Sequence, residues 1–446
     1  MLYDKKLASF TENGKTTTLM ALAWPIFFQS LTSHFIGTGN VLVVSNYSEI
    51  LVTVTSVTNQ IVNLIVTILA AVASGMAIMV SVAFGASKKQ EAEKQSGIAA
   101  VTAFIFAVIP SVFLFIFAKA TISAMNLTGE TALLSATYLK GRAIALPITV
   151  VTGVINRYFI CNGHSKPVLI SSVSISAFSV FLSYLFFYVV RLPIDDIAFL
   201  VYKNIFICVL QLLVALVLMQ KYKLSMKLGF NFHTAFRLLR LGIPVAMCGI
   251  TATLASTVTT GFVANMGEQM INAKAYINDI ISYVPTFCYA VSSAHSIIIG
   301  RYRGRCEFEN ISALHKQSLY LGVLINGILS VLVFIFHRPL LSIFTSDPAI
   351  IGVAKWVLII DIPLEIFRAV NNMSEGSLNP CGDVFVTFLA SVLSCWVMGV
   401  MLAWVLCEAL SLGLVGLWVA FAMNEVTKMI VYILRWRSGK WKTAKV

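Results

Sequence analysis

Long apolar stretches, separated by short polar connections, follow one another through almost the whole chain. Each is long enough for a membrane-spanning helix, which needs roughly 20 predominantly apolar residues. Only 11% of the residues are charged, less than half of the share of about 25% that is usual in soluble domains. The sequence therefore predicts an all-α polytopic membrane protein with twelve transmembrane helices. We place them near residues 17–45, 51–84, 96–118, 131–160, 167–190, 197–220, 235–264, 272–300, 316–336, 351–378, 385–408 and 412–434.

The basic residues are distributed unevenly between the predicted loops. The chain carries a net charge of +13, and most of its 32 Lys and Arg residues lie before the first stretch, after the even-numbered stretches and in the tail. Loops on the cytoplasmic side of membrane proteins are enriched in Lys and Arg. This pattern predicts a multi-pass protein of a plasma membrane or bacterial inner membrane with both termini in the cytoplasm. The basic excess is therefore a signal of orientation in the lipid bilayer, and we do not expect nucleic-acid binding.

Sequence features recur at a constant offset of 219 positions. The matching pairs are Pro25 in LAWPIFF with Pro244 in LGIPVAM, Gly85 with Gly304, and Gly163 with Gly382. An even number of spans separates the two copies, so the repeat is parallel. We expect a cytoplasmic N-terminal segment (1–16), a six-helix lobe (17–220), a cytoplasmic linker (221–234), a second six-helix lobe (235–434) and a basic cytoplasmic tail (435–446).

This duplication suggests how the chain works. Two similar lobes that rotate as rigid bodies can open a polar route between them to either side of the membrane in turn. Pro25 and Pro244 remove a backbone donor and are expected to bend their helices, which is tolerated beside a water-filled cavity.

The tenth stretch carries the most conspicuous intramembrane charges. Asp361, Glu365 and Arg368 are spaced i, i+4 and i+7, so they share one helix face, which should point to the interior of the bundle. We expect Glu365 to pair with Arg368, which leaves Asp361 free to bind a cation or a proton. A purely structural ion pair is the alternative. Asn371, Asn372 and Glu375 continue the same polar face.

Other polar residues within the spans are candidates for the lining of a cavity. Asn278 and Asp279 lie in the eighth stretch, and their counterparts at the repeat offset are Asn59 and Gln60. We predict that these two pairs face a common cavity, with hydrogen bonding between helices as the alternative.

Two further intramembrane charges fall in the fourth and twelfth stretches. Arg142 has Asp361 as its counterpart at the repeat offset, so the two could meet between the lobes. Glu425 and Lys428 lie three residues apart in the twelfth stretch and should satisfy each other.

Short segments along the chain resemble one transporter family. They are LAWPIFFQSL, FGASKKQEAEK, LGIPVAM, FTSDPAII, GSLNPCGDVFVTFL, LGLVGLWVAF and WRSGKWK. In order and spacing they are similar to the multidrug and toxic compound extrusion (MATE) transporters, from about residue 17 to 442. The resemblance implies a V-shaped pair of six-helix bundles around a central cavity. It also implies efflux of organic, cationic or amphipathic compounds by alternating access, driven by inward flow of protons or sodium.

The sequence departs from the family at its usual coupling residues. The family commonly has a carboxylate late in the first span, where this chain has Asn40, an amide that takes up no proton near neutral pH. A partner carboxylate of some members aligns near Ser183, and an acid that others carry in the tenth span falls close to Arg368. Asp361 is therefore our chief candidate for the coupling or substrate carboxylate.

Three classes of function remain open. The first is a secondary-active exporter of organic compounds, for which Asp279, Asp361 or Glu365 should be needed. The second is a relative that moves an anionic metabolite or a lipid-linked substrate, for which Arg142 or Arg368 should be needed. The third is a receptor or assembly factor that retains the fold. We expect no enzymatic activity, no metal site and no cofactor other than the coupling proton or sodium ion, and we expect a monomer that binds a small organic substrate.

Overall fold

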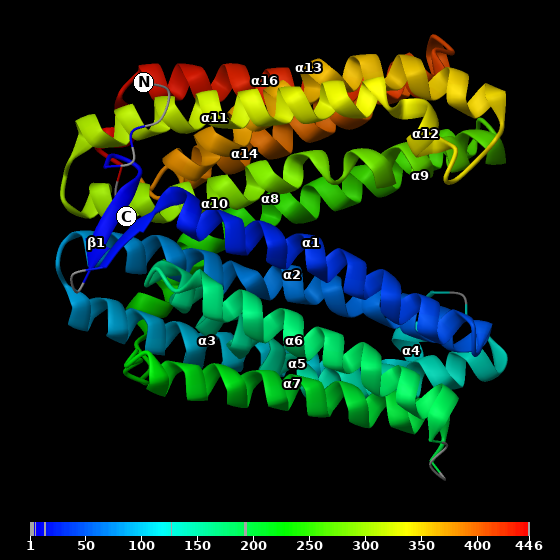
Figure 1. Ribbon diagram of the computed structural model, residues 1–446, viewed down its shortest axis with the longest axis horizontal. Coiled ribbons are helices and arrows are strands. Elements are labelled where there is room, and N and C mark those ends of the chain that lie inside the picture. Colours follow the sequence, from blue (N-terminus) through cyan, green and yellow to red (C-terminus); the bar gives the residue numbers. More distant parts are fainter. Residues whose placement is uncertain (1–3, 5, 13–14, 126, 191–193, 445–446) are drawn as a thin grey trace. The chain divides into compact units, whose positions relative to one another are not determined.

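The computed structural model describes residues 4, 6–12, 15–125, 127–190 and 194–444. Parts of the predicted N-terminal segment and of the basic tail lie outside this range. The first half contains α1 Leu19–Ser45, α2 Glu49–Gly85, α3 Lys89–Ile116, α4 Ala118–Ser123, α5 Gly129–Cys161, α6 Ser165–Tyr184 and α7 Asp196–Lys221 (Figure 1). The second half contains α8 Phe232–Ala264, α9 Glu268–Ile281, α10 Val284–Gly304, α11 Phe308–Ile335, α12 His337–Leu341, α13 Pro348–Leu378, α14 Val384–Ser394, α15 Leu402–Trp404 and α16 Gly413–Arg437. Short π-helical segments occupy Leu185–Val189, Cys395–Met401 and Val405–Ala409.

The helices confirm a polytopic all-α membrane protein. Within the described residues, ten helical segments are long and apolar enough to cross a membrane. The remaining two predicted spans correspond to α13, which carries five charged residues, and to the pair α9 and α10. With these two included, the helices account for the twelve predicted spans.

The duplication seen in the sequence is repeated in the backbone. Helices α3 and α11 have 28 residues each, and their first residues, Lys89 and Phe308, are 219 positions apart. The turns repeat as well, because Ser87 and Cys306 both have a φ of 60°. The two halves are therefore copies of one helical pattern down to the connecting turns.

The eighth predicted span, near residues 272–300, is interrupted. It consists of α9 and α10, interrupted at residues 282–283. Pro285 stands at the start of α10 and cannot donate the backbone hydrogen bond that would continue a helix. Its counterpart in the first half is Val66, and there α2 runs unbroken for 37 residues. A single proline thus explains why the two copies differ at this place.

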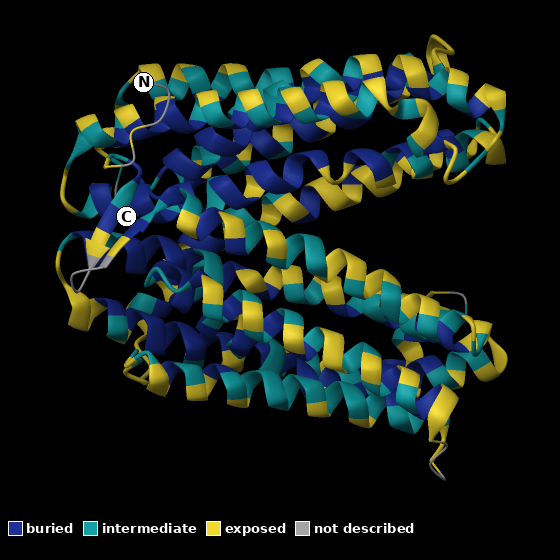
Figure 2. Cartoon of the chain, in the orientation of Figure 1, coloured by how far each residue is buried: buried dark blue, intermediate teal, exposed yellow. Residues whose placement is uncertain are grey.

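The chain forms two compact units. The C-terminal unit comprises Met1–Phe27, Ser81–Ser87 and Met247–Val446, and the N-terminal unit comprises Phe28–Val80 and Lys88–Ala246. These units differ from the predicted lobes at the beginnings of α1 and α8 and at the end of α2. Figure 2 shows buried residues gathered on helix faces that pack within each unit, whereas the outer faces of α7 and α11 are intermediate or exposed.

The beginning of α1 belongs to the C-terminal unit and the beginning of α8 to the N-terminal unit. Small residues at matching positions explain this exchange. In the C-terminal unit, Ala23 of α1 and Ala294 of α10 are fully buried in one apolar cluster. In the N-terminal unit, their repeat counterparts are Gly242 of α8 and Gly75 of α2. A Cβ on either glycine would collide with the backbone of the other helix. Small residues thus stand at these matching positions of both units, and in the N-terminal unit they allow the two helix backbones to approach closely.

A second close contact is reciprocal within the C-terminal unit. A Cβ added to Gly85 would collide with the carbonyl oxygen of Arg301, and one added to Gly304 would collide with that of Val82. Gly85 and Gly304 are repeat counterparts, and so are Val82 and Arg301. Only glycine allows the ends of α2 and α10 to approach so closely.

The N-terminal segment forms a β-hairpin, which the sequence did not lead us to expect. Strand β1 (Ser9–Glu12) pairs antiparallel with β2 (Lys15–Thr18). Phe10 is 4% exposed, and the guanidinium of Arg301 lies 3.7 Å from the centre of its ring. The hydroxyl of Tyr302 donates to the carbonyl of Leu7 (2.7 Å), so the hairpin is anchored to α10.

Candidate functional site

Helix α13 carries most of the candidate residues, and its sequence explains its position. Asp347 caps its N-terminus by accepting a hydrogen bond from the backbone of Ala349 (2.9 Å), and Pro348 occupies the first turn. Hydrogen bonds from the Gln269 side chain and the Ala349 backbone lower the pKa of Asp347. Pro363, inside the helix, leaves the carbonyl group four residues earlier without its usual partner. That irregular turn spans residues 359–363 and includes Asp361.

The predicted charged face of α13 points into the C-terminal unit. Asp361 is 2% exposed and Glu365 is fully buried. As expected, Glu365 forms an ion pair with Arg368. Asn326 of α11 donates a hydrogen bond to the other Glu365 carboxylate oxygen (3.2 Å). Both oxygens of Glu365 are thus engaged.

Asp361 has a different environment. Its carboxylate accepts a hydrogen bond from Nε1 of Trp418 on α16 (3.2 Å). Among the described residues, it forms no ion pair with a basic side chain. A buried carboxylate without a paired cation is costly, and in membrane proteins such groups mark ion or proton sites.

A second charged group lies further along α13 and α16. Glu425 pairs with Lys428 (2.7 Å), as their spacing predicts, and accepts a hydrogen bond from Nδ2 of Asn371 (2.7 Å). Glu375 accepts from the hydroxyl of Tyr432 (2.6 Å). Sequence analysis placed Glu375 on the polar face of α13 but did not identify Tyr432 as its partner.

These groups together form what we call the acidic cluster. Its members are Asp361, Glu365, Glu375 and Glu425 with the cations Arg368 and Lys428. Four carboxyl groups are accompanied by two basic groups, so the cluster can take up additional positive charge. Its members lie on α13 and α16, which pack against each other in the C-terminal unit.

The N-terminal unit carries basic rather than acidic groups within its spans. Arg142 on α5 and Lys203 on α7 lie within electrostatic range of each other. The ammonium of Lys203 donates to the hydroxyl of Ser183 (2.6 Å). Nε of Arg142 and Oδ1 of Asn40 are buried, and neither has a hydrogen-bond partner among the described residues. Sequence analysis missed Lys203, because its partners are on other helices.

The remaining predicted pairs are split between the units. Asn59 and Gln60 lie on α2 in the N-terminal unit, whereas Asn278 and Asp279 lie on α9 in the C-terminal unit. Gln60 and Asp279 are exposed, and the two asparagines are partly buried. That the pairs face a common cavity stays a prediction, as does the meeting of Arg142 with Asp361. Pro25 and Pro244 lie inside α1 and α8, as expected.

A buried histidine network was also missed. Nε2 of His295 and Nδ1 of His315 both contact the hydroxyl of Ser377 (2.7 and 2.8 Å), which itself donates to the carbonyl of Met373 (2.9 Å). Both rings must therefore donate to Ser377. Ser318 then donates to Nδ1 of His295 (2.9 Å). Neutral histidines satisfy every contact in this network.

Comparison with known proteins supports the same fold. The MatE family model matches the chain twice, at residues 25–185 and 244–405, and the two matches begin at the repeat counterparts Pro25 and Pro244. The chain belongs to the MatE family. It is a multi-pass membrane transporter of this family.

Individual relatives and solved structures of MatE-type proteins resemble the chain over nearly its whole length. The "Uncharacterized transporter YisQ" of Bacillus subtilis is 28% identical over 436 residues, which cover 96% of this chain and 95% of that protein. The "Probable multidrug resistance protein YoeA" of the same species is 22% identical over 371 residues, which cover 81% of this chain and 80% of that protein. A solved transporter of the MOP superfamily from Pyrococcus furiosus, described by the reverse polarity of its binding pocket, matches with a TM-score of 0.85 at 16% identity. The match covers 95% of this chain and 96% of that chain.

Proposed function

We propose that this MatE-family protein is a secondary-active exporter of organic compounds that works by alternating access between its two repeats. Influx of protons or sodium ions across a cell membrane would drive the export. The observation that carries the proposal is Asp361, a buried carboxylate that accepts a hydrogen bond from Trp418 and forms no ion pair among the described residues. The name of the relative YoeA agrees with multidrug efflux.

The acidic cluster would be the place where the coupling cation binds. Glu365 and Glu425 are held by Arg368 and Lys428, so their charge is already balanced. Asp361 retains free capacity for a proton or a sodium ion. Asn40 and Ser183 replace carboxylates that other family members use in the first repeat, so coupling would depend on the second repeat alone.

The alternative is export of an anionic compound, and the N-terminal unit favours it. Arg142 and Lys203 are basic groups inside the membrane-spanning region, and the buried Nε of Arg142 lacks a hydrogen-bond partner among the described residues. The Pyrococcus furiosus transporter, which has the same fold, is described by a reversed pocket polarity. Under this proposal, Arg142 and Lys203 bind the substrate, while the acidic cluster still binds the coupling ion.

Counterflow in reconstituted vesicles tests these proposals. A panel of cationic, neutral and anionic organic solutes is offered under separately imposed proton and sodium gradients. We expect gradient-driven movement of at least one class of solute. Loss of anion transport in Arg142→Gln, with cation transport unchanged, would select the anionic alternative. If no solute moves under either gradient, the protein is not a secondary exporter, and the receptor or assembly role becomes the better account.

A further inference from the structure

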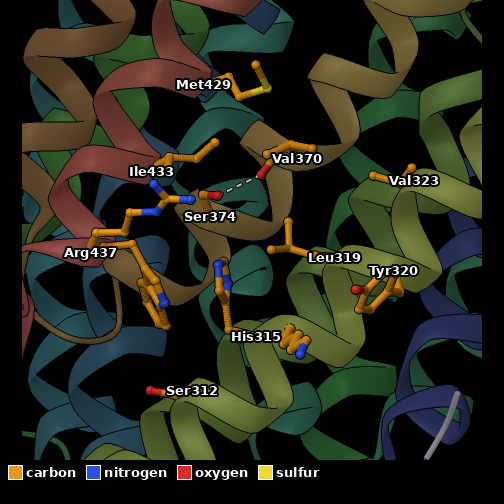
Figure 3. Close-up of a pocket in the computed structure, with 12 residues that line it drawn as sticks. Ser312, His315, Leu319, Tyr320, Val323, Val370, Ser374, Met429, Ile433 and Arg437 are labelled. Carbon is orange, nitrogen blue, oxygen red and sulfur yellow. Dashed lines mark hydrogen bonds between the residues drawn. The ribbon is translucent and has the colours of Figure 1, made fainter. Parts of the chain in front are cut away.

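A cavity of about 600 Å³ lies between the ends of α11 and α16 and the last turns of α13 (Figure 3). Its volume is within the range of about 300–1,000 Å³ that is usual for ligand sites. None of the residues that form the acidic cluster lines it. The cavity is therefore separate from the proposed coupling site, although both include residues of α13.

The charges around this cavity are all basic. Lys316 of α11 and Arg437 of α16 line it, and both side chains are exposed. Neither forms an ion pair within the described part of the chain. None of its described lining residues is acidic. The cavity thus suits a ligand with negative charge.

The inner walls are apolar and continue into the outer surface of the helices. Leu319 and Val323 of α11 face Met429 and Ile433 of α16 across the cavity. Beyond it, large apolar side chains are exposed along both helices, including Leu324, Ile328, Ile430 and Leu434. In a membrane protein, such a surface faces the hydrocarbon chains of lipids.

Aromatic residues make one wall rigid. Trp436 stacks on His315 (ring centres 3.9 Å apart) and on Trp441 of the tail (4.4 Å). Arg303 holds the tail in place by donating to the carbonyl of Lys442 (2.8 Å). In Figure 3, the side chains of Arg437 and His315 point toward Ser374 of α13 from different helices. Tyr320, also in the lining, is 57% exposed. Tryptophan and tyrosine are typical of the depth at which lipid headgroups lie.

We propose that this cavity binds one anionic phospholipid. The phosphate lies between Lys316 and Arg437, and an acyl chain follows the apolar wall between α11 and α16. Basic pockets between membrane helices on the cytoplasmic side bind acidic lipid headgroups. The start of α11 and the end of α16, which line the cavity, lie on the side of the membrane that we place in the cytoplasm. The assignment to the inner leaflet therefore rests on the proposed orientation.

Native mass spectrometry of the full-length protein in detergent tests this proposal. Dioleoylphosphatidylglycerol, dioleoylphosphatidylcholine and inorganic phosphate are titrated in separate arms. We expect preferential retention of one phosphatidylglycerol molecule. Replacing both basic residues, in Lys316→Gln with Arg437→Gln, should weaken its affinity roughly 30-fold, since each basic residue near the headgroups contributes a factor of about five. The matched control, Lys88→Gln with Lys89→Gln, removes two exposed charges outside the cavity and should leave the affinity unchanged.

A second variant separates the cavity from a general surface charge effect. Leu319→Trp keeps both basic residues but fills the apolar wall, so it should also abolish retention of phosphatidylglycerol. The proposal is overturned if the control weakens binding as much as the cavity variant, or if Leu319→Trp retains the lipid. Displacement of the lipid by inorganic phosphate would instead indicate a site for a free anion.

Discussion

At the scale of single residues, the balance of charge inside the C-terminal unit decides what the site can do. Each buried carboxylate must be compensated, because an isolated charge in a medium of low dielectric constant is too costly to keep. Glu365 and Glu425 are compensated by basic residues three positions further along the same helix. Asp361 receives a hydrogen bond from a tryptophan instead.

Removing one member of a buried ion pair should destabilise the protein. In Arg368→Met, the fully buried Glu365 loses its partner, and we expect the free energy of unfolding to fall by about 3–5 kcal/mol. The double variant Glu365→Gln with Arg368→Met leaves no uncompensated charge, and glutamine can still accept from Asn326. It should recover most of the loss. Denaturant unfolding in detergent measures both, and equal destabilisation of the two variants would contradict this reading of the pair.

The sequence allowed only part of the site to be predicted, for a physical reason. Glu365 with Arg368, and Glu425 with Lys428, are neighbours on one helix face, so their spacing reveals the contact. The contacts of Asp361 with Trp418 and of Lys203 with Ser183 join different helices. No local pattern encodes such contacts, because they depend on how helices pack.

At the scale of helices, apolar length and proline predicted most of the architecture. The main exception is the eighth stretch, where Pro285 begins a new helix rather than bending an existing one. The apolar pattern alone cannot distinguish these outcomes, since a broken helix and a continuous one bury similar side chains. The β-hairpin was missed because its anchor is Arg301, on a helix far away in the sequence.

The contact between the ends of α2 and α10 should depend on glycine. In Gly304→Ala, the new methyl group would collide with the Val82 carbonyl, which is backbone and cannot rotate away. We expect a loss of about 1–3 kcal/mol, as for other overpacked sites. Gly153→Ala in α5 is the control, because among the described residues no atom beyond the adjoining helix backbone lies within 4 Å of its added Cβ. It should be neutral or slightly stabilising. Thermal unfolding compares the variants, and similar effects of both would contradict the proposed contact.

At the scale of the whole molecule, the protein consists of two repeats of one helical pattern. The two repeats differ in the sign of the charges that they carry within their spans. The C-terminal unit contains the acidic cluster, while Arg142 and Lys203 give the N-terminal unit the opposite sign. The repeat could be recognised from three sequence matches. The difference in charge could be recognised only in part, from Arg142 and its counterpart Asp361, because Lys203 stands alone in an apolar stretch.

The predicted orientation can be tested with a native cysteine. Cys306, in the turn between α10 and α11, is the exposed one among the eight cysteines, and the others are buried or partly buried. If both termini are cytoplasmic, a membrane-impermeant maleimide should label Cys306 in inside-out vesicles but not in right-side-out vesicles. Cys306→Ser provides the background. Labelling of Cys306 from the outside would reverse the orientation.

The role of Asp361 is tested most directly by comparing gradient-driven accumulation with counterflow in reconstituted vesicles. A driving force equivalent to about 100 mV supplies about 2.3 kcal/mol per coupling charge, enough for about 50-fold accumulation of substrate. We predict that Asp361→Asn loses this accumulation but retains counterflow, because asparagine keeps the acceptor for Trp418 and lacks the titratable group. Asp361→Glu should retain part of the gradient-driven accumulation. The control Asp195→Asn, at an exposed loop position, should retain all of this accumulation. Accumulation by Asp361→Asn equal to that of the unmodified protein would contradict the account.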